Sequence, residues 1–89
     1  MIERKITIKN KLGLHARAAV KFVNTANRFR ASVKIVKDGD EVDGKSILGI
    51  LTLAAVQGTH ITLKVAGEDE DMALKALVSL IENKFLEKE

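Results

Sequence analysis

The apolar residues of this chain change their spacing several times within 89 residues. In some segments nearly every second residue is apolar, as in half-buried strands, and in others the apolar residues recur at the spacing of one helix face. The strand-like segments are residues 2–8, 31–35 and 61–65, and the helix-like segments are residues 16–26, 47–56 and 73–81. Strands and helices must therefore be interleaved along the chain.

A hairpin adds a fourth strand to this pattern. Asp38, Gly39 and Asp40 make a tight turn into a short strand at residues 41–43, which should pair with the strand before it. The expected order is then β-α-β-β-α-β-α. This order predicts an α/β domain of the α+β two-layer type, with three helices on one face of a largely antiparallel, four-stranded sheet. Because no linker or low-complexity stretch interrupts it, residues 1–89 should form a single domain.

Composition narrows the classes of protein that remain. Hydrophobic residues make up 46% of the chain, which is enough for one core. Cysteine is absent, and the only two histidines, His15 and His60, are far apart in the sequence, so neither a metal nor any other cofactor is expected. The apolar runs are too short for a membrane span, and no apolar segment follows the N-terminal charges as in a signal peptide. We therefore expect a cytoplasmic domain without membrane insertion.

The charges are distributed unevenly. Residues 1–37 carry ten Lys or Arg and one acid, whereas residues 38–89 carry five Lys or Arg and eleven acids. The basic half suggests an acidic partner, a phosphorylated ligand or a nucleic acid, although charges on ordinary solvated faces explain it more simply. The three aromatic residues are all phenylalanine, too few for a stacking platform, so no nucleic acid is expected as a partner.

The first candidate site is Gly-Leu-His-Ala-Arg at residues 13–17, where a turn leads into a helix. A helix start offers unpaired N–H groups and the positive end of a dipole to an anion. His15 could accept a proton or a phosphoryl group near neutral pH, and Arg17 could hold phosphate oxygens. Gly13 would let the turn bring the imidazole over the helix end. On spacing alone, a poorly capped helix with a solvated arginine explains the pattern at least as well.

The second candidate site is Gly-Lys-Ser at residues 44–46, before the second helix. Ser46 should be an N-cap, and a phosphate added to it would be favoured by the helix dipole, although capping is the simpler role. A P-loop is rejected, because the glycine at the required spacing is Gly39 and three of the four intervening residues are acids that would repel phosphates. His60, which has no evident partner, is assigned a structural role.

Together, the two motifs resemble those of the histidine-containing phosphocarrier family, HPr, of the phosphoenolpyruvate-dependent phosphotransferase system. The resemblance covers the whole chain and rests on residues 13–17 and on Gly-Lys-Ser-Ile-Leu-Gly-Ile at residues 44–50. It implies an open-faced β-sandwich. It also implies that His15 accepts a phosphoryl group on Nδ1 from Enzyme I and passes it to a IIA protein, while Arg17 pairs with the phosphoryl oxygens. Such a protein is a carrier that needs partner enzymes, and is not itself an enzyme.

The resemblance also implies regulation. In some bacteria the serine that Ser46 matches is phosphorylated by a dedicated HPr kinase/phosphorylase. The alternative function is therefore a regulatory binding module that acts mainly through phospho-Ser46 in carbon catabolite control, and the presence of His15 argues against it. Ala18 stands where many relatives have proline, and Asn24 and Asn27 stand where some have lysine. Sugar uptake and nitrogen-related regulation both remain open as the pathway served.

A docking surface is expected beside the histidine. The first and second helices should lie side by side, which would bring His15 near Ser46. The second helix is apolar nearly all round, so part of it must face solvent or a partner. The expected docking residues are Val20, Lys21, Lys45, Ile47, Leu48 and Leu51. Lys21 and Lys45 would belong to a basic rim that steers acidic partners toward the site. Because a carrier should expose its site, a monomer is expected.

Overall fold

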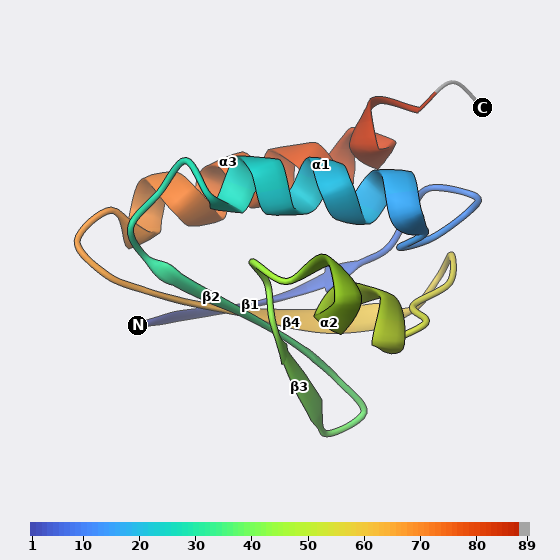
Figure 1. Cartoon of the computed structure of the whole chain (residues 1–89), viewed down its shortest axis with the longest axis horizontal. Helices are drawn as coiled ribbons and strands as arrows, with labels where there is room; N and C mark the ends of the chain where they lie inside the picture. The colour runs from blue at the N-terminus through green and yellow to red at the C-terminus, as the bar shows by residue number, and fades with distance from the viewer. Residues whose placement is uncertain (88–89) are drawn as a thin grey trace.

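The computed structural model describes residues 1–87 and shows a four-stranded sheet with helices on one face (Figure 1). The strands are β1 (Ile2–Thr7), β2 (Ser32–Lys37), β3 (Asp40–Asp43) and β4 (His60–Ala66). The helices are α1 (Ala16–Ala26), α2 (Ile47–Thr52) and α3 (Glu70–Glu82), followed by a short 3-10 turn, η1 (Lys84–Leu86). The expected order is confirmed as far as α3, and η1 is an addition to it.

The sheet is antiparallel throughout, in the order β1-β4-β2-β3. The predicted β2–β3 hairpin is confirmed, and β4, the last strand in the chain, lies between β1 and β2. Ile61 of β4 stands opposite Ile6 of β1, and Leu63 of β4 stands opposite Ile35 of β2. All four side chains are buried, so the alternation seen in the sequence gives the sheet one face toward the core.

The core lies between this face and the two long helices, which lie side by side over the sheet (Figure 1). Phe22 of α1 is fully buried, as are Leu77 and Ile81 of α3. The helical spacing at residues 73–81 predicts that Ala73, Leu77, Leu80 and Ile81 face the core. This is confirmed except for Leu80, which is only partly buried, and Leu74 is buried as well. Removal of this apolar surface from water, at about 25 cal/mol per Å², is the main contribution that stabilises such a fold.

Helix α2 is shorter than expected. The apolar spacing predicts a helix over residues 47–56, but α2 ends at Thr52, and Ala54 beyond it is left-handed, with a φ of 49°. Lys37 Nζ donates a hydrogen bond of 2.9 Å to the carbonyl oxygen of Leu53, which satisfies an acceptor left free at the helix end. An apolar run of this length does not distinguish a long helix from a short helix followed by a packed loop.

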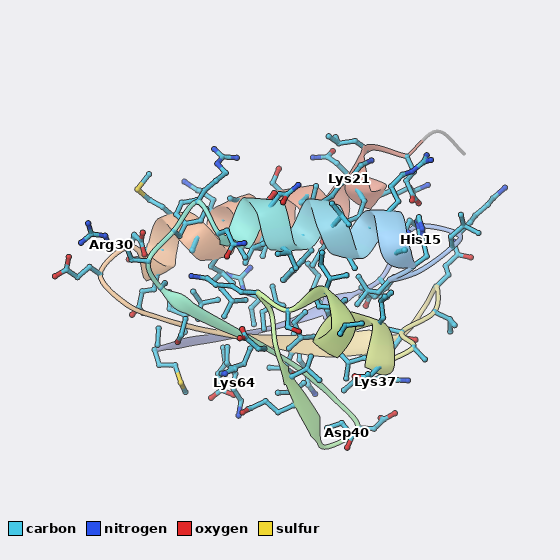
Figure 2. The ribbon with its side chains drawn as sticks, viewed as in Figure 1. His15, Lys21, Arg30, Lys37, Asp40 and Lys64 are labelled. Carbon is cyan, nitrogen blue, oxygen red and sulfur yellow. The ribbon has the colours of Figure 1, made fainter. Side chains whose placement is uncertain are left out.

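An acidic residue just before α3 joins two segments that are far apart in the sequence. Asp69 accepts hydrogen bonds from the backbone N–H groups of Arg30 and Ala31, at 2.9 and 2.8 Å. It therefore ties the loop between α1 and β2 to the start of α3. Figure 2 shows that Arg30 and His15 lie at opposite ends of the helix layer, so this cross-link stabilises the end far from the histidine.

Candidate functional site

The turn before α1 is held against the segment that follows α2. Gly13 has a φ of +65°, and a Cβ atom on it would lie 2.3 Å from the carbonyl oxygen of Ala55. The next residue, Leu14, is buried and donates a backbone hydrogen bond of 2.8 Å to the same oxygen. Only glycine combines this backbone conformation with so close an approach. Gly13 thus lets the turn pack tightly beneath the start of the helix.

His15 is the N-cap of α1, but its side chain does not cap the helix. Its backbone is extended, and its carbonyl oxygen accepts the first helical hydrogen bond, from Ala19 at 2.9 Å. Within residues 1–87, the N–H groups of Ala16, Arg17 and Ala18 have no hydrogen-bond acceptor. An anion at the start of α1 would meet these groups and the positive end of the helix dipole.

The imidazole of His15 is turned toward the C-terminal end of the described chain. Its Nε2 atom is hydrogen-bonded to the carboxylate of Glu87, and 27% of the side chain is exposed. The other ring nitrogen, Nδ1, has no hydrogen-bond partner among residues 1–87. One nitrogen is therefore held, and the other is available for chemistry.

An open depression adjoins the imidazole. Its lining includes Lys11, Leu12, His15, Arg17, Lys21 and Glu87. Figure 2 shows His15 at the N-terminal end of α1 and Lys21 further along the same helix. Arg17 is exposed and makes no hydrogen bond or ion pair to any other described residue. Among the lining residues that the structure describes, cationic side chains outnumber carboxylates, which favours an anion here, and the exposed Arg17 is well placed to bind it.

The turn η1 reaches the same depression, and sequence reasoning missed it. Lys84, Phe85 and Leu86 all have positive φ, between 55° and 61°, a conformation that costs a non-glycine residue roughly 1–2 kcal/mol. Phe85 is fully buried, and its carbonyl oxygen accepts a hydrogen bond of 2.6 Å from Lys21 Nζ. The available signal was a large aromatic residue after the last helical stripe, which indicates that the chain packs onto the core there.

Glu87 follows this turn, and two side chains hold its carboxylate. Asn10 Nδ2 donates a hydrogen bond of 2.9 Å to Glu87 Oε1, and His15 Nε2 contacts the other carboxylate oxygen. Burial alone would raise the pKa of Glu87, but the hydrogen bonds from Asn10 and His15, together with the charges of His15 and Lys21, lower it below its ordinary value. Glu87 is therefore ionised at neutral pH. Sequence reasoning singled out neither Glu87 nor Asn10.

Ser46 is the N-cap of α2, as predicted. Gly49 N–H donates a hydrogen bond of 3.0 Å to Ser46 Oγ, and the serine is partly buried. The start of α2 therefore uses its own side chain to satisfy a free N–H group.

His15 and Ser46 stand at the starts of two helices that run antiparallel, and their expected proximity stays a prediction. Helices α1 and α2 lie side by side, as predicted, but they run in opposite directions (Figure 1). The chain before α1 contacts the chain after α2, whereas Lys45, just before α2, donates a hydrogen bond of 2.8 Å to the carbonyl oxygen of Phe29, just after α1. The β2–β3 hairpin returns the chain toward the C-terminal end of α1, so α1 and α2 start from opposite directions, and α2, with six residues, is only about 9 Å long.

The predicted docking residues fall into two groups. The four apolar ones are exposed, and we call them the apolar patch: Val20, Ile47, Leu48 and Leu51. The two lysines, which were expected to form a free basic rim, are instead hydrogen-bonded to backbone carbonyl groups. Lys21 donates its hydrogen bond to the carbonyl oxygen of Phe85, and Lys45 donates to that of Phe29. Each lysine therefore contributes a positive charge and also holds a loop in place.

The remaining histidine lies outside this site. His60 Nδ1 and Thr7 Oγ1 are 2.9 Å apart, across the β1–β4 pair, which gives His60 a partner that sequence reasoning did not find. Among residues 1–87, no group of three or more His, Cys, Asp or Glu side chains is arranged to hold a metal ion. In the same part of the chain, no helix has both the length and the apolar character needed to cross a membrane.

The fold and the site define a class of protein: a small α+β domain that presents an available imidazole nitrogen and an uncommitted arginine at an open helix start. The family described as PTS HPr component phosphorylation site matches residues 2–83. The phosphocarrier protein HPr of Pseudomonas aeruginosa is 54% identical over 86 residues, which cover 96% of each chain. The chain belongs to the HPr family, the phosphocarriers of the bacterial phosphotransferase system.

Solved structures of the family agree with the fold. A crystal structure of HPr from Thermoanaerobacter tengcongensis matches with a TM-score of 0.96 and 49% identity over the whole of both chains. A second one, described as an HPr dimer from the same organism, has a TM-score of 0.77 and 50% identity, and covers 96% of this chain and 98% of that chain. The fold implied by the resemblance is confirmed. Members of the family are phosphocarriers rather than catalysts.

Proposed function

We propose that His15 is the residue of this chain that carries the phosphoryl group. The observation behind the proposal is an available Nδ1 atom beside an uncommitted Arg17 at an open helix start. In the proposed reaction the Nδ1 lone pair attacks the phosphorus of phosphorylated Enzyme I. The N–P bond forms as the bond from phosphorus to the donor breaks, and the donor keeps that electron pair. Attack by an acceptor atom of a IIA protein then removes the group and returns the lone pair to Nδ1.

The groups around His15 would hold the phosphoryl oxygens without enclosing them. The guanidinium of Arg17 offers N–H donors in a fork that matches phosphate oxygens. The N–H groups of Ala16, Arg17 and Ala18 offer further donors at the helix start. Arg17 is exposed and the depression is open. Such an arrangement combines positioning and charge stabilisation with easy release, which suits a carrier.

The apolar patch is the proposed docking surface for Enzyme I and the IIA protein. Val20 lies three residues after Arg17 on α1, so the patch begins on the helix face next to the site. A small apolar surface with positive charge at its border would attract acidic partners quickly and release them quickly. The proposed carrier acts in the cytoplasm as a monomer, for either sugar uptake or regulation.

Transfer of phosphate from phosphoenolpyruvate through a general Enzyme I tests this function. We expect the intact mass of the wild type to rise by one acid-labile phosphoryl group. His60→Ala is the matched control, because it removes the other histidine, and it should be labelled as well. His15→Ala should take no label. A labelled His15→Ala variant would overturn the assignment, as would an unlabelled wild type with an Enzyme I that charges another HPr.

Ser46 carries a second, regulatory proposal. Its hydroxyl lies at the start of α2, next to the exposed Ile47 and Leu48 of the apolar patch. A phosphate there would add about two negative charges beside the patch and repel an acidic partner. Because Ser46 adjoins the apolar patch and is not part of the lining of the depression beside His15, a phosphate on it would act on docking and not on the imidazole itself.

The Ser46 proposal is tested with an HPr kinase/phosphorylase and ATP. We expect an acid-stable phosphate on the wild type and on Ser32→Ala, a control that removes an exposed serine elsewhere in the chain, but none on Ser46→Ala. Label that persists in Ser46→Ala would contradict the proposal.

A further inference from the structure

Glu87 meets His15 on the side of the ring away from the proposed reacting atom. Its carboxylate is hydrogen-bonded to Nε2, and its side chain is only 11% exposed. The carboxylate is brought there by the three left-handed residues of η1 and is held there by Asn10. Bond formation at Nδ1 does not itself involve this contact.

The hydrogen bonds of Asn10 and Glu87 determine which nitrogen of His15 carries the hydrogen. Asn10 is fully buried, and its Nδ2 atom donates to the carbonyl oxygen of Gly13 at 2.7 Å and to Glu87 Oε1 at 2.9 Å. Both of these oxygens are acceptors, so the amide must present its NH2 group to them. An ionised carboxylate has no proton to donate, so the hydrogen shared with His15 must be on Nε2. In a neutral imidazole the lone pair is then on Nδ1.

We propose that Glu87 is a positioning residue, which holds His15 in the tautomer that leaves the lone pair on Nδ1 for the phosphoryl group. The proposal rests on His15 being the phosphoryl acceptor. As the N–P bond forms, the donor leaves with its electron pair and Nε2 keeps its proton. The ring therefore gains positive charge, and the carboxylate of Glu87 faces that charge. An interaction that strengthens as charge develops lowers the barrier to transfer.

The backbone around Glu87 is consistent with such a role. Three consecutive left-handed residues that are not glycine cost roughly 1–2 kcal/mol each. Strain of this kind persists where the surrounding structure imposes it, often at functional sites. Here the burial of Phe85 and the hydrogen bond from Lys21 impose it, two residues before Glu87. The fold thus maintains an unfavourable turn, η1, which places the carboxylate of Glu87 against the imidazole of His15.

Two substitutions at Glu87 separate positioning from packing. Glutamine has the same shape but only one acceptor oxygen. If that oxygen accepts from Asn10, the glutamine NH2 group must face His15 Nε2, and the ring hydrogen must move to Nδ1. We expect Glu87→Gln to accept phosphate from Enzyme I about 10- to 100-fold more slowly than the wild type. It should also accept phosphate more slowly than Glu87→Ala, in which a water molecule can accept the hydrogen bond from Nε2. A residue that only packs would show the opposite order, because glutamine preserves shape better than alanine.

The 15N chemical shifts of the His15 ring provide a readout that does not need Enzyme I. We expect the hydrogen on Nε2 in the wild type and on Nδ1 in Glu87→Gln. Glu82→Gln, at an exposed glutamate that pairs with Lys9, is the matched control and should keep the rate and tautomer of the wild type.

Three results would overturn the proposal: a wild-type hydrogen on Nδ1, equal transfer rates for Glu87→Gln and the wild type, or faster transfer by Glu87→Gln than by Glu87→Ala. Failure of the proposed function has a different signature, since the wild type itself would then take no label, whatever its tautomer.

Discussion

Helices α1 and α2 begin in different ways, although both follow a turn that contains glycine. At α2, Ser46 turns its hydroxyl back onto the helix and accepts a hydrogen bond from Gly49 N–H. At α1, His15 occupies the same N-cap position but turns its ring away, toward Glu87. A capped helix start satisfies its N–H groups internally, whereas an uncapped one can offer them to a ligand. This difference explains why we place the phosphoryl site at α1.

The largest effect is expected where the turn packs beneath α1. Gly13→Ala would place a Cβ atom 2.3 Å from the carbonyl oxygen of Ala55, in a left-handed conformation. We expect it to lower the free energy of unfolding by roughly 3–5 kcal/mol. Gly39→Ala is the matched control, because Gly39 is also left-handed but a Cβ atom there has no neighbour within 4 Å. It should cost only about 1–2 kcal/mol.

Urea unfolding of the two glycine variants measures the difference. Equal losses of stability would show that the close approach at Gly13 does not hold the start of α1 in place.

A smaller effect on stability is expected when serine and alanine are compared at the two N-cap positions, 15 and 46. Ser46→Ala removes a cap and should lower the free energy of unfolding by about 1 kcal/mol. His15→Ser should be more stable than His15→Ala by a similar amount, because serine would cap the open start of α1. Urea unfolding of the wild type and the three variants measures both differences. If His15→Ser and His15→Ala were equally stable, the N–H groups of α1 would not be available to an acceptor.

The smallest effect is a dependence of stability on pH. The pKa of Glu87 is held below its ordinary value of 4.5, so the folded chain binds this proton less tightly than the unfolded chain. The resulting stability is present above about pH 4.5 and is lost as the pH falls through the folded-state pKa. The stability difference between the wild type and Glu87→Gln should therefore shrink between pH 5.5 and pH 3. A constant difference would show that the folded state does not favour the charged form of Glu87.

Much of the fold could be predicted because the apolar spacing is regular. Ile61 and Leu63 alternate with polar residues and are buried on β4, and the cap at Ser46 follows from residue type and position. The spacing of apolar residues along two helices does not determine whether the helices pack parallel or antiparallel. For that reason the side-by-side packing of α1 and α2 could be predicted, while their opposite directions could not.

The contacts of the imidazole could not be predicted from local patterns. Asn10 and Glu87 are 77 residues apart in the sequence, and neither belongs to a helix or strand. They meet because η1 turns in the left-handed sense, which no glycine at residues 84–86 signals. The motif at residues 13–17 therefore identified the candidate acceptor and Arg17, but not the carboxylate that faces the ring.

The position of the phosphoryl group on the ring of His15 tests the central claim most directly. After transfer from Enzyme I to protein labelled with 15N-histidine, the coupling between 15N and 31P identifies the bonded nitrogen. The account predicts Nδ1, because Nε2 carries a hydrogen and faces Glu87. A phosphoryl group on Nε2, or on any side chain other than His15, would contradict it.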